Sequence, residues 1–156
     1  DLHMDGDAQW LAPYAAPERW KDVHVPLGRA RTYAASEKAA LTIITSGNGL
    51  FMSLRVQKRL VAQGLFVDVV DMRWIAPMPI DDLLVAANAT GKVLLVDETR
   101  RTGGIAESVM AALLDRDFEG KLARVASEDS FIPLGDAACG PQARSTLNTA
   151  GDKLVS

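Results

Sequence analysis

The sequence predicts an α/β domain of three layers, in which helices cover both faces of a mainly parallel β-sheet. Short apolar runs rich in β-branched residues alternate with stretches whose apolar residues recur at helical spacing. Each helical stretch is long enough to carry the chain back across a sheet, which favours parallel strands joined by right-handed crossovers. We expect four such strands in succession, and an antiparallel strand is an open possibility at the edge of the sheet.

Each expected element has its own signal. The strands are expected at residues 41–45, 66–72, 93–96 and 122–126, and the helices at 50–63, 80–90 and about 104–117. Asp81 and Asp82 complement the positive end of the second helix because they stand in its first turn. Gly64 and Gly91 suit the left-handed conformation that ends a helix.

The first helix has an apolar side and a charged side. The side chains expected to face the core are Leu50, Leu54 and Val61, and those expected to face solvent are Arg55, Lys58 and Arg59. Residues 46–49, which precede it, are interpreted as a tight turn whose glycines serve the backbone geometry. An anion loop or a hydroxyl nucleophile remains the alternative there, although the usual nucleophile elbow is missing.

Residues 1–39 form a different kind of segment, which we interpret as an extended linker or arm from a missing preceding domain. Prolines interrupt it, and no apolar periodicity runs through it. Its aromatic side chains, Trp10, Tyr14 and Trp20, need cover from this domain or another one. A weak alternation predicts a short edge strand at residues 23–27. The α/β domain is expected to occupy residues 40–156.

Composition excludes several classes of protein. The chain has 156 residues and a net charge of −3, which fits one globular domain and argues against nucleic acid or an anionic membrane as partner. No apolar run approaches the roughly 20 residues that span a bilayer. The single cysteine, Cys139, cannot form an internal disulfide and fits a reducing compartment, so we expect a cytoplasmic protein. The start at Asp1 predicts a fragment or a processed piece.

The stretch after the strand at 93–96 carries the candidate site. Two acids, two arginines and a Gly-Gly pair lie there, between the carboxyl end of a strand and the start of a helix. Such a place suits an anion, because the crevice of an open α/β sheet lies there and a helix N-terminus offers unpaired N–H groups. The residues expected to contact an anion or an acidic partner are Glu98, Arg100, Arg101, Gly103 and Gly104. In the alternative interpretation the glycines only turn the backbone and the arginines are a solvated rim paired with neighbouring acids.

No acid–base constellation accompanies this stretch. Both histidines lie outside the α/β core, and one cysteine with two histidines cannot build a typical structural zinc site. We therefore assign no catalytic, cofactor-binding or metal-binding residue. A domain of this kind is expected to be one part of a larger enzyme or a binding module, and a regulatory anion-binding module is the alternative function. A free-standing hydrolase is a third hypothesis.

The order of motifs resembles the C-terminal domain of the thiamine-diphosphate-dependent 2-oxoacid dehydrogenases (the E1 component), within the wider transketolase C-terminal domain group. The motifs that carry the resemblance lie at residues 25–30, 41–49, 70–81, 96–104 and 127–135. The match runs from about residue 1 to residue 138, and it is nearest the pyruvate or branched-chain type. Residues 1–20 resemble the link from a preceding pyrimidine-binding domain.

The resemblance implies a five-stranded, mainly parallel sheet. It further implies an oxidoreductase whose thiamine diphosphate and Mg2+ bind in the two preceding domains, so no cofactor is expected in this fragment and the fragment itself is expected to be inactive. The implied partners are those preceding domains, the E1 dimer mate and the dihydrolipoyl acyltransferase (E2). In such enzymes this domain supports dimerisation and helps to dock E2, and it contributes no catalytic residue that can be carried over to this chain.

Overall fold

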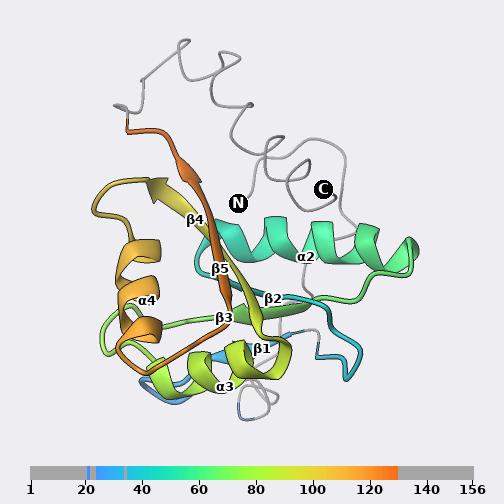
Figure 1. The fold of residues 1–156 in the computed structure, drawn as a ribbon, viewed down its shortest axis with the longest axis horizontal. Helices are drawn as coiled ribbons and strands as arrows, with labels where there is room; N and C mark the ends of the chain where they lie inside the picture. The colour runs from blue at the N-terminus through green and yellow to red at the C-terminus, as the bar shows by residue number, and fades with distance from the viewer. Residues whose placement is uncertain (1–20, 22–23, 34, 130–156) are drawn as a thin grey trace.

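The computed structural model describes residues 21, 24–33 and 35–129, and these form one α/β sheet structure (Figure 1). The sheet has five strands in the order β1-β3-β2-β4-β5. The strands are β1 (Arg31–Thr32), β2 (Thr42–Thr45), β3 (Asp68–Asp71), β4 (Lys92–Arg100) and β5 (Lys121–Ser127). The helices are α2 (Asn48–Ala62), α3 (Ile80–Thr90) and α4 (Ile105–Leu114).

Four of the strands run parallel, as the alternation of strands and helices predicted. β2 pairs with β3 on one side and β4 on the other, and β5 continues the parallel set beyond β4. β1 is antiparallel to β3, with Arg31 opposite Asp71. The predicted fold class is therefore confirmed, including the mainly parallel five-stranded sheet that the resemblance implied.

Helices cover both faces of the sheet (Figure 1). Side chains of β2 alternate between the faces, so that neighbours in sequence enter different cores. Ile43 packs with Leu50 and Leu60 of α2, whereas Ile44 packs with the apolar side chains of α3 and α4. Both isoleucines are only 1% exposed. Burying an aliphatic side chain of this size contributes about 1.5–3 kcal/mol, which explains why the centre of β2 is apolar and the whole strand is β-branched.

The ends of the helices agree with the glycine signals. Gly91 is the C-cap of α3 in the left-handed conformation, and its N–H donates to the carbonyl of Ala87. Gly64, which follows the C-cap residue of α2, also has a positive φ of 81°. Helix α4 ends at Leu114, three residues before the predicted end at 117, because the N–H of Phe118 turns back to the carbonyl of Leu113.

The prediction that Val61 faces the core is wrong. Val61 is 36% exposed, while Leu60 beside it is buried at 7%. The chain turns back directly after α2, and the N–H of Leu65 donates to the carbonyl of Leu60 at 3.0 Å. The chain segment that turns back covers Leu60 and leaves Val61 at the edge of the core. Leu50 and Leu54 do pack in the core with the predicted orientation.

The antiparallel edge strand exists, but not where the alternation at 23–27 predicted it. Residues 24–27 form no strand, and the chain turns there, with the N–H of Arg29 donating to the carbonyl of Pro26 at 3.1 Å. The edge strand is β1, four residues later. The sheet therefore takes in a stretch that was assigned to the linker, although the division at residue 40 stays a prediction. Trp10, Tyr14, Trp20 and Cys139 lie outside the described residues.

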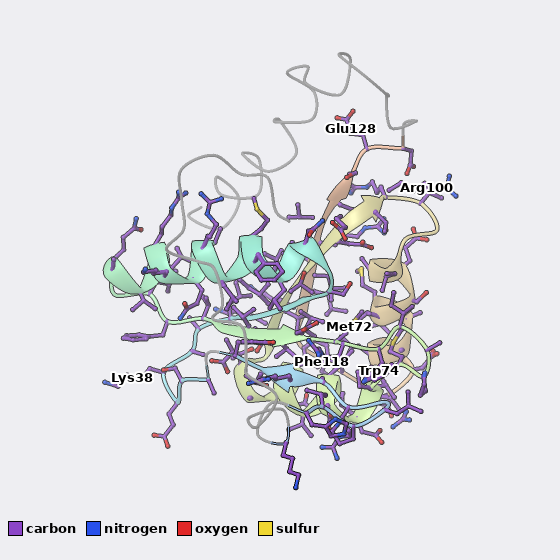
Figure 2. All side chains as sticks on the ribbon, turned by 180° about the vertical axis from the view of Figure 1, so that it is seen from behind. Lys38, Met72, Trp74, Arg100, Phe118 and Glu128 are labelled. Atoms are coloured by element: carbon purple, nitrogen blue, oxygen red, sulfur yellow. The ribbon has the colours of Figure 1, made fainter. Side chains whose placement is uncertain are left out.

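Strand β4 is longer than predicted. It continues through the polar residues to Arg100, so the turn begins at Arg101 rather than after Val96. β2 ends opposite Val96, and from there on β4 pairs only with β5, ending with Arg100 opposite Ser127. A two-stranded ribbon exposed to water has no need of apolar side chains, so the sequence carries no strand signal there. Figure 2 shows Arg100 and Glu128 at this far end of the molecule.

Candidate functional site

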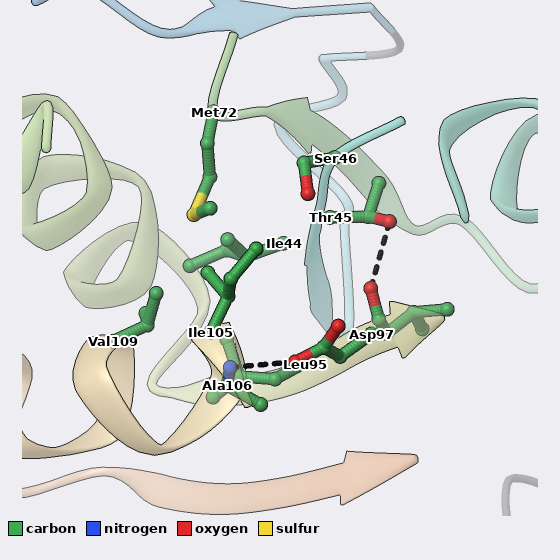
Figure 3. Close-up of a pocket in the computed structure, with 10 residues that line it drawn as sticks. Ile44, Thr45, Ser46, Met72, Leu95, Asp97, Ile105, Ala106 and Val109 are labelled. Carbon is green, nitrogen blue, oxygen red and sulfur yellow. Dashed lines mark hydrogen bonds between the residues drawn. The ribbon is translucent and has the colours of Figure 1, made fainter. Parts of the chain in front are cut away.

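The candidate site lies where the strand order reverses. The chain leaves β2 to form β3 on one side and later returns to form β4 on the other. Ligands of open α/β sheets bind at such a switch point, beyond the carboxyl ends of the strands. Here a cavity of about 10 Å3 lies between β2, β4 and the start of α4, which is room for about one water molecule (Figure 3).

On the β2 side, the crevice is closed because the end of β2 and the residues after it lie very close to β4. Thr45 Oγ1 donates to the carbonyl of Val96 at 2.8 Å, which ties the end of β2 to β4 (Figure 3). Gly47 has a φ of 58°, and a Cβ there would stand 2.6 Å from Oε1 of Glu98. A Cβ on Gly49 would stand 3.2 Å from the carbonyl oxygen of Val96. The tight turn is shorter than predicted, because α2 begins at Asn48 and Gly49 lies in its first turn. Glycine at positions 47 and 49 serves the backbone geometry and the close approach of β4.

The β4 side is closed by Asp97, which caps helix α4 from outside the helix. Its Oδ2 accepts the N–H of Ala106 at 2.8 Å (Figure 3). Its Oδ1 accepts both the N–H and the hydroxyl of Thr99, at 2.8 and 2.7 Å. The N-cap residue, Gly104, has no side chain to do this, and a Cβ there would stand 2.9 Å from Asp97 Oδ2. Asp97 and Gly104 therefore form one capping unit.

Two further carboxylates hold the loop that leads into α4. Glu107 accepts the N–H of Gly103 at 2.9 Å, and Arg124 Nη1 donates to the same carboxylate at 3.1 Å. Asp129 accepts the N–H of Thr102 at 2.7 Å and also its hydroxyl. These hydrogen bonds lower the pKa of both acids: the Gly103 N–H is the main cause for Glu107, and the Thr102 hydroxyl is the main cause for Asp129.

The five predicted contact residues do not form one cluster. Gly103 and Gly104 enter the capped loop, and Glu98 lies beside Gly47 on the opposite side of the crevice. Arg100 and Arg101 are exposed, and neither makes an ion pair with a described residue. The backbone N–H groups of Thr102, Gly103 and Ala106 already donate hydrogen bonds to carboxylates of this chain. An external anion would have to displace them, and the anion site stays a prediction.

Sequence analysis missed the roles of Asp97, Thr102 and Asp129. One signal was available for Glu107, because an acid three residues after a helix N-cap is the mark of a capping box. No local pattern marks the other acids, since Asp97 caps a helix nine residues later and Asp129 reaches back from the end of β5.

No group of three or more histidine, cysteine or acidic residues in the part of the chain that the structure describes could hold a metal ion. None of the described helices is long and apolar enough to cross a membrane.

Comparison with known families assigns the fold. The model of the transketolase C-terminal domain matches residues 30–144, which include all five strands of the described sheet. The chain belongs to the transketolase C-terminal domain family. The family match agrees with the resemblance seen in the motifs, although it begins later than residue 1 and continues beyond residue 138.

The curated relatives of this transketolase C-terminal domain include subunits of pyruvate dehydrogenase. The β subunit of the E1 component from Bacillus subtilis is 33% identical over 116 residues, which are 72% of this chain and 35% of the relative. The corresponding subunit from Staphylococcus epidermidis is 30% identical over 120 residues, 75% of this chain and 36% of that subunit. The chain therefore spans about a third of the length of the curated relatives it matches.

Two solved structures share the fold of this transketolase C-terminal domain. A split-gene transketolase, described as an inactive β4 tetramer, aligns with a TM-score of 0.69 and 24% identity, over 85% of this chain and 44% of that one. The 2-oxoglutarate:ferredoxin oxidoreductase from Magnetococcus marinus aligns with a TM-score of 0.53 and 15% identity, over 83% and 21%. At these identities the likeness shows the fold alone.

Proposed function

We propose that this chain is the C-terminal domain of an E1 component of a 2-oxoacid dehydrogenase complex, and that it supports the enzyme without catalysing a step. The observation that carries the proposal is the 33% identity to a pyruvate dehydrogenase E1 β subunit across 72% of the chain. The parent enzyme would decarboxylate a 2-oxoacid oxidatively, such as pyruvate or a branched-chain 2-oxoacid, and transfer the acyl group to the lipoyl group of E2.

The crevice at the switch point supports a structural role. In many open α/β sheets a ligand fills this place. Here its free volume is about 10 Å3, and the helix start beside it is capped by Asp97. The backbone N–H groups at the helix start, which could bind an anion, instead donate to carboxylates that hold β4, α4 and the loop between them together. A rigid, internally satisfied edge is what a supporting domain needs.

The remaining parts of the proposal concern the parent enzyme. Thiamine diphosphate and Mg2+ would bind to its preceding domains, which supply the chemistry. The partners of this domain would be those domains, the E1 dimer mate and E2, and the assembly would work in the cytoplasm. The identity of the E1 relatives supports these assignments.

Isothermal titration calorimetry tests whether the cofactor binds outside this chain. Thiamine diphosphate with Mg2+ is titrated into the 156-residue chain, and no saturable heat is expected. A control titration uses an intact E1 component, which must bind the cofactor under the same conditions. Binding by the isolated chain with a Kd near 1 μM, about 8 kcal/mol, would overturn the proposal.

A further inference from the structure

Two exposed turns lie against each other beside β1, the edge strand of the sheet. A Cβ on Gly28 in the first turn would stand 3.2 Å from Cγ of Pro77 in the second. Leu27 is 65% exposed and Ile75 is 57% exposed, two of the larger exposures among the big apolar side chains of the described residues. We call the exposed apolar residues of these turns the two-turn patch: Pro26, Leu27, Ile75, Ala76 and Pro77.

The second turn is held in place by β3. Arg73 has a φ of 60°, a backbone conformation that residues other than glycine rarely adopt. Its N–H donates to Oδ1 of the buried Asp71 at 3.0 Å, and its guanidinium lies 3.6 Å from the same carboxylate. These contacts tie the start of the second turn to the end of β3. Figure 2 shows Met72 and Trp74 on the chain as it enters this turn.

A groove with two arginines in its lining adjoins the patch. It has a volume of about 380 Å3 and is lined by His24, Val25, Pro26, Arg29, Ala30 and Arg31. Two of these six residues are arginines, one is a histidine, and none is acidic. Pro26 belongs to both the groove and the patch, so the two features form a continuous surface.

Arg29 is oriented toward solvent by a carboxylate of α3. Its Nε donates to Oδ2 of Asp82 at 2.7 Å, and its side chain is 64% exposed. Its terminal nitrogens make no hydrogen bond with a described residue, so they can bind a carboxylate of another molecule. The hydrogen bond from Arg29 lowers the pKa of Asp82, which keeps that anchor charged. The guanidinium of Arg31 lies over the ring of Tyr33, 4.9 Å from its centroid.

We propose that the two-turn patch and the groove together dock an acidic segment of another protein chain. Apolar side chains of that segment would cover Leu27 and Ile75, and its carboxylates would reach the guanidinium groups of the groove. An apolar patch alone would select no partner, whereas a lining with two arginines and no acidic residue favours an acidic one. Nucleic acid is disfavoured because the whole chain has a net charge of −3. This surface stands independently of the E1 assignment.

Nuclear magnetic resonance titration of the 15N-labelled chain tests the surface. The probe is a short peptide of glutamate, aspartate, leucine and serine, and the matched control peptide has lysine at every acidic position. The acidic peptide should shift the amide signals of residues 24–31 and 73–78, saturate below about 1 mM and weaken as salt rises. Equal binding of the lysine peptide, or shifts confined to other elements, would overturn the proposal.

Variants distinguish specific binding at this surface from nonspecific binding of the peptide to exposed apolar side chains. Leu27→Ser with Ile75→Ser should weaken the acidic peptide at least tenfold, and Arg29→Gln should reduce the salt dependence. Val85→Ser with Leu114→Ser is the matched control, because those side chains are 73% and 58% exposed on α3 and α4. Unchanged affinity in the first variant would contradict the proposal. So would signals of the patch that shift with protein concentration alone, which would identify a second copy of the chain as the occupant.

Discussion

Replacing Asp97 by alanine should destabilise the chain far more than its place at a polar strand end suggests. The carboxylate caps α4 through the N–H of Ala106 at 2.8 Å and holds Thr99 through two more hydrogen bonds. Loss of an N-cap costs about 1 kcal/mol, and hydrogen bonds to a charged group contribute about 1.5–3 kcal/mol. We expect Asp97→Ala to lower the free energy of unfolding by about 2 kcal/mol, which is a fall in Tm of about 4–8 °C for a domain of this size.

The neighbouring acid provides the control for this measurement. Glu98 is exposed and none of its side-chain atoms makes a hydrogen bond with a described residue, so Glu98→Ala should change stability by less than about 0.5 kcal/mol. Urea denaturation followed by circular dichroism measures both variants. Asp97→Asn should fall between them, because it keeps an acceptor oxygen without the charge. If Asp97→Ala were no less stable than Glu98→Ala, the capping unit would have no energetic role.

Three other predictions follow from the same loop and its carboxylates. Gly104→Ala should cost about 2–4 kcal/mol in urea unfolding, since its Cβ would meet Asp97 and Thr99 Oγ1 at 2.9 and 2.7 Å. It should cost more than Gly64→Ala, whose Cβ meets nothing within 4 Å and which pays only for its positive φ of 81°. The folded chain lowers the pKa values of Glu107 and Asp129, so the stability that they contribute is complete above their ordinary pKa values of 4.5 and 3.8 and is lost as the pH falls through the lowered values. The urea midpoint should therefore fall in acid, and it should fall less in Glu107→Gln. A urea midpoint that rises in acid would contradict this prediction. Inorganic phosphate should leave the Tm unchanged in a thermal scan, whereas an anion-binding module would gain about 2.7 kcal/mol at 100 times the Kd and lose it in Arg100→Ala.

The central elements could be predicted because their signals are local. Ile43 and Ile44 stand in an apolar run that is buried on both faces, and Leu83 and Ala87 repeat at helical spacing on α3. Gly91 ends that helix with the left-handed conformation that glycine adopts without strain. For these parts of the chain, the periodicity and the tertiary packing agree.

The site was harder to predict because its contacts join distant residues. Asp97 is polar and follows an apolar run, so it reads as the start of a turn, yet it stays in β4 and caps a helix. Asp129 binds Thr102 across 27 residues of sequence. The two-residue strand β1 is too short to show alternation, and only its pairing with β3 defines it.

A chimera tests the central claim that this chain is the supporting domain of an E1 enzyme. In the Bacillus subtilis pyruvate dehydrogenase E1 β subunit, the stretch that this chain matches is replaced by the corresponding residues of this chain. Pyruvate-dependent reduction of an artificial electron acceptor is then measured with the α subunit and thiamine diphosphate present. We expect the chimera to assemble and turn over, whereas a β subunit without that stretch should do neither. A chimera that folds by circular dichroism but neither joins the α subunit nor turns over pyruvate would contradict the account.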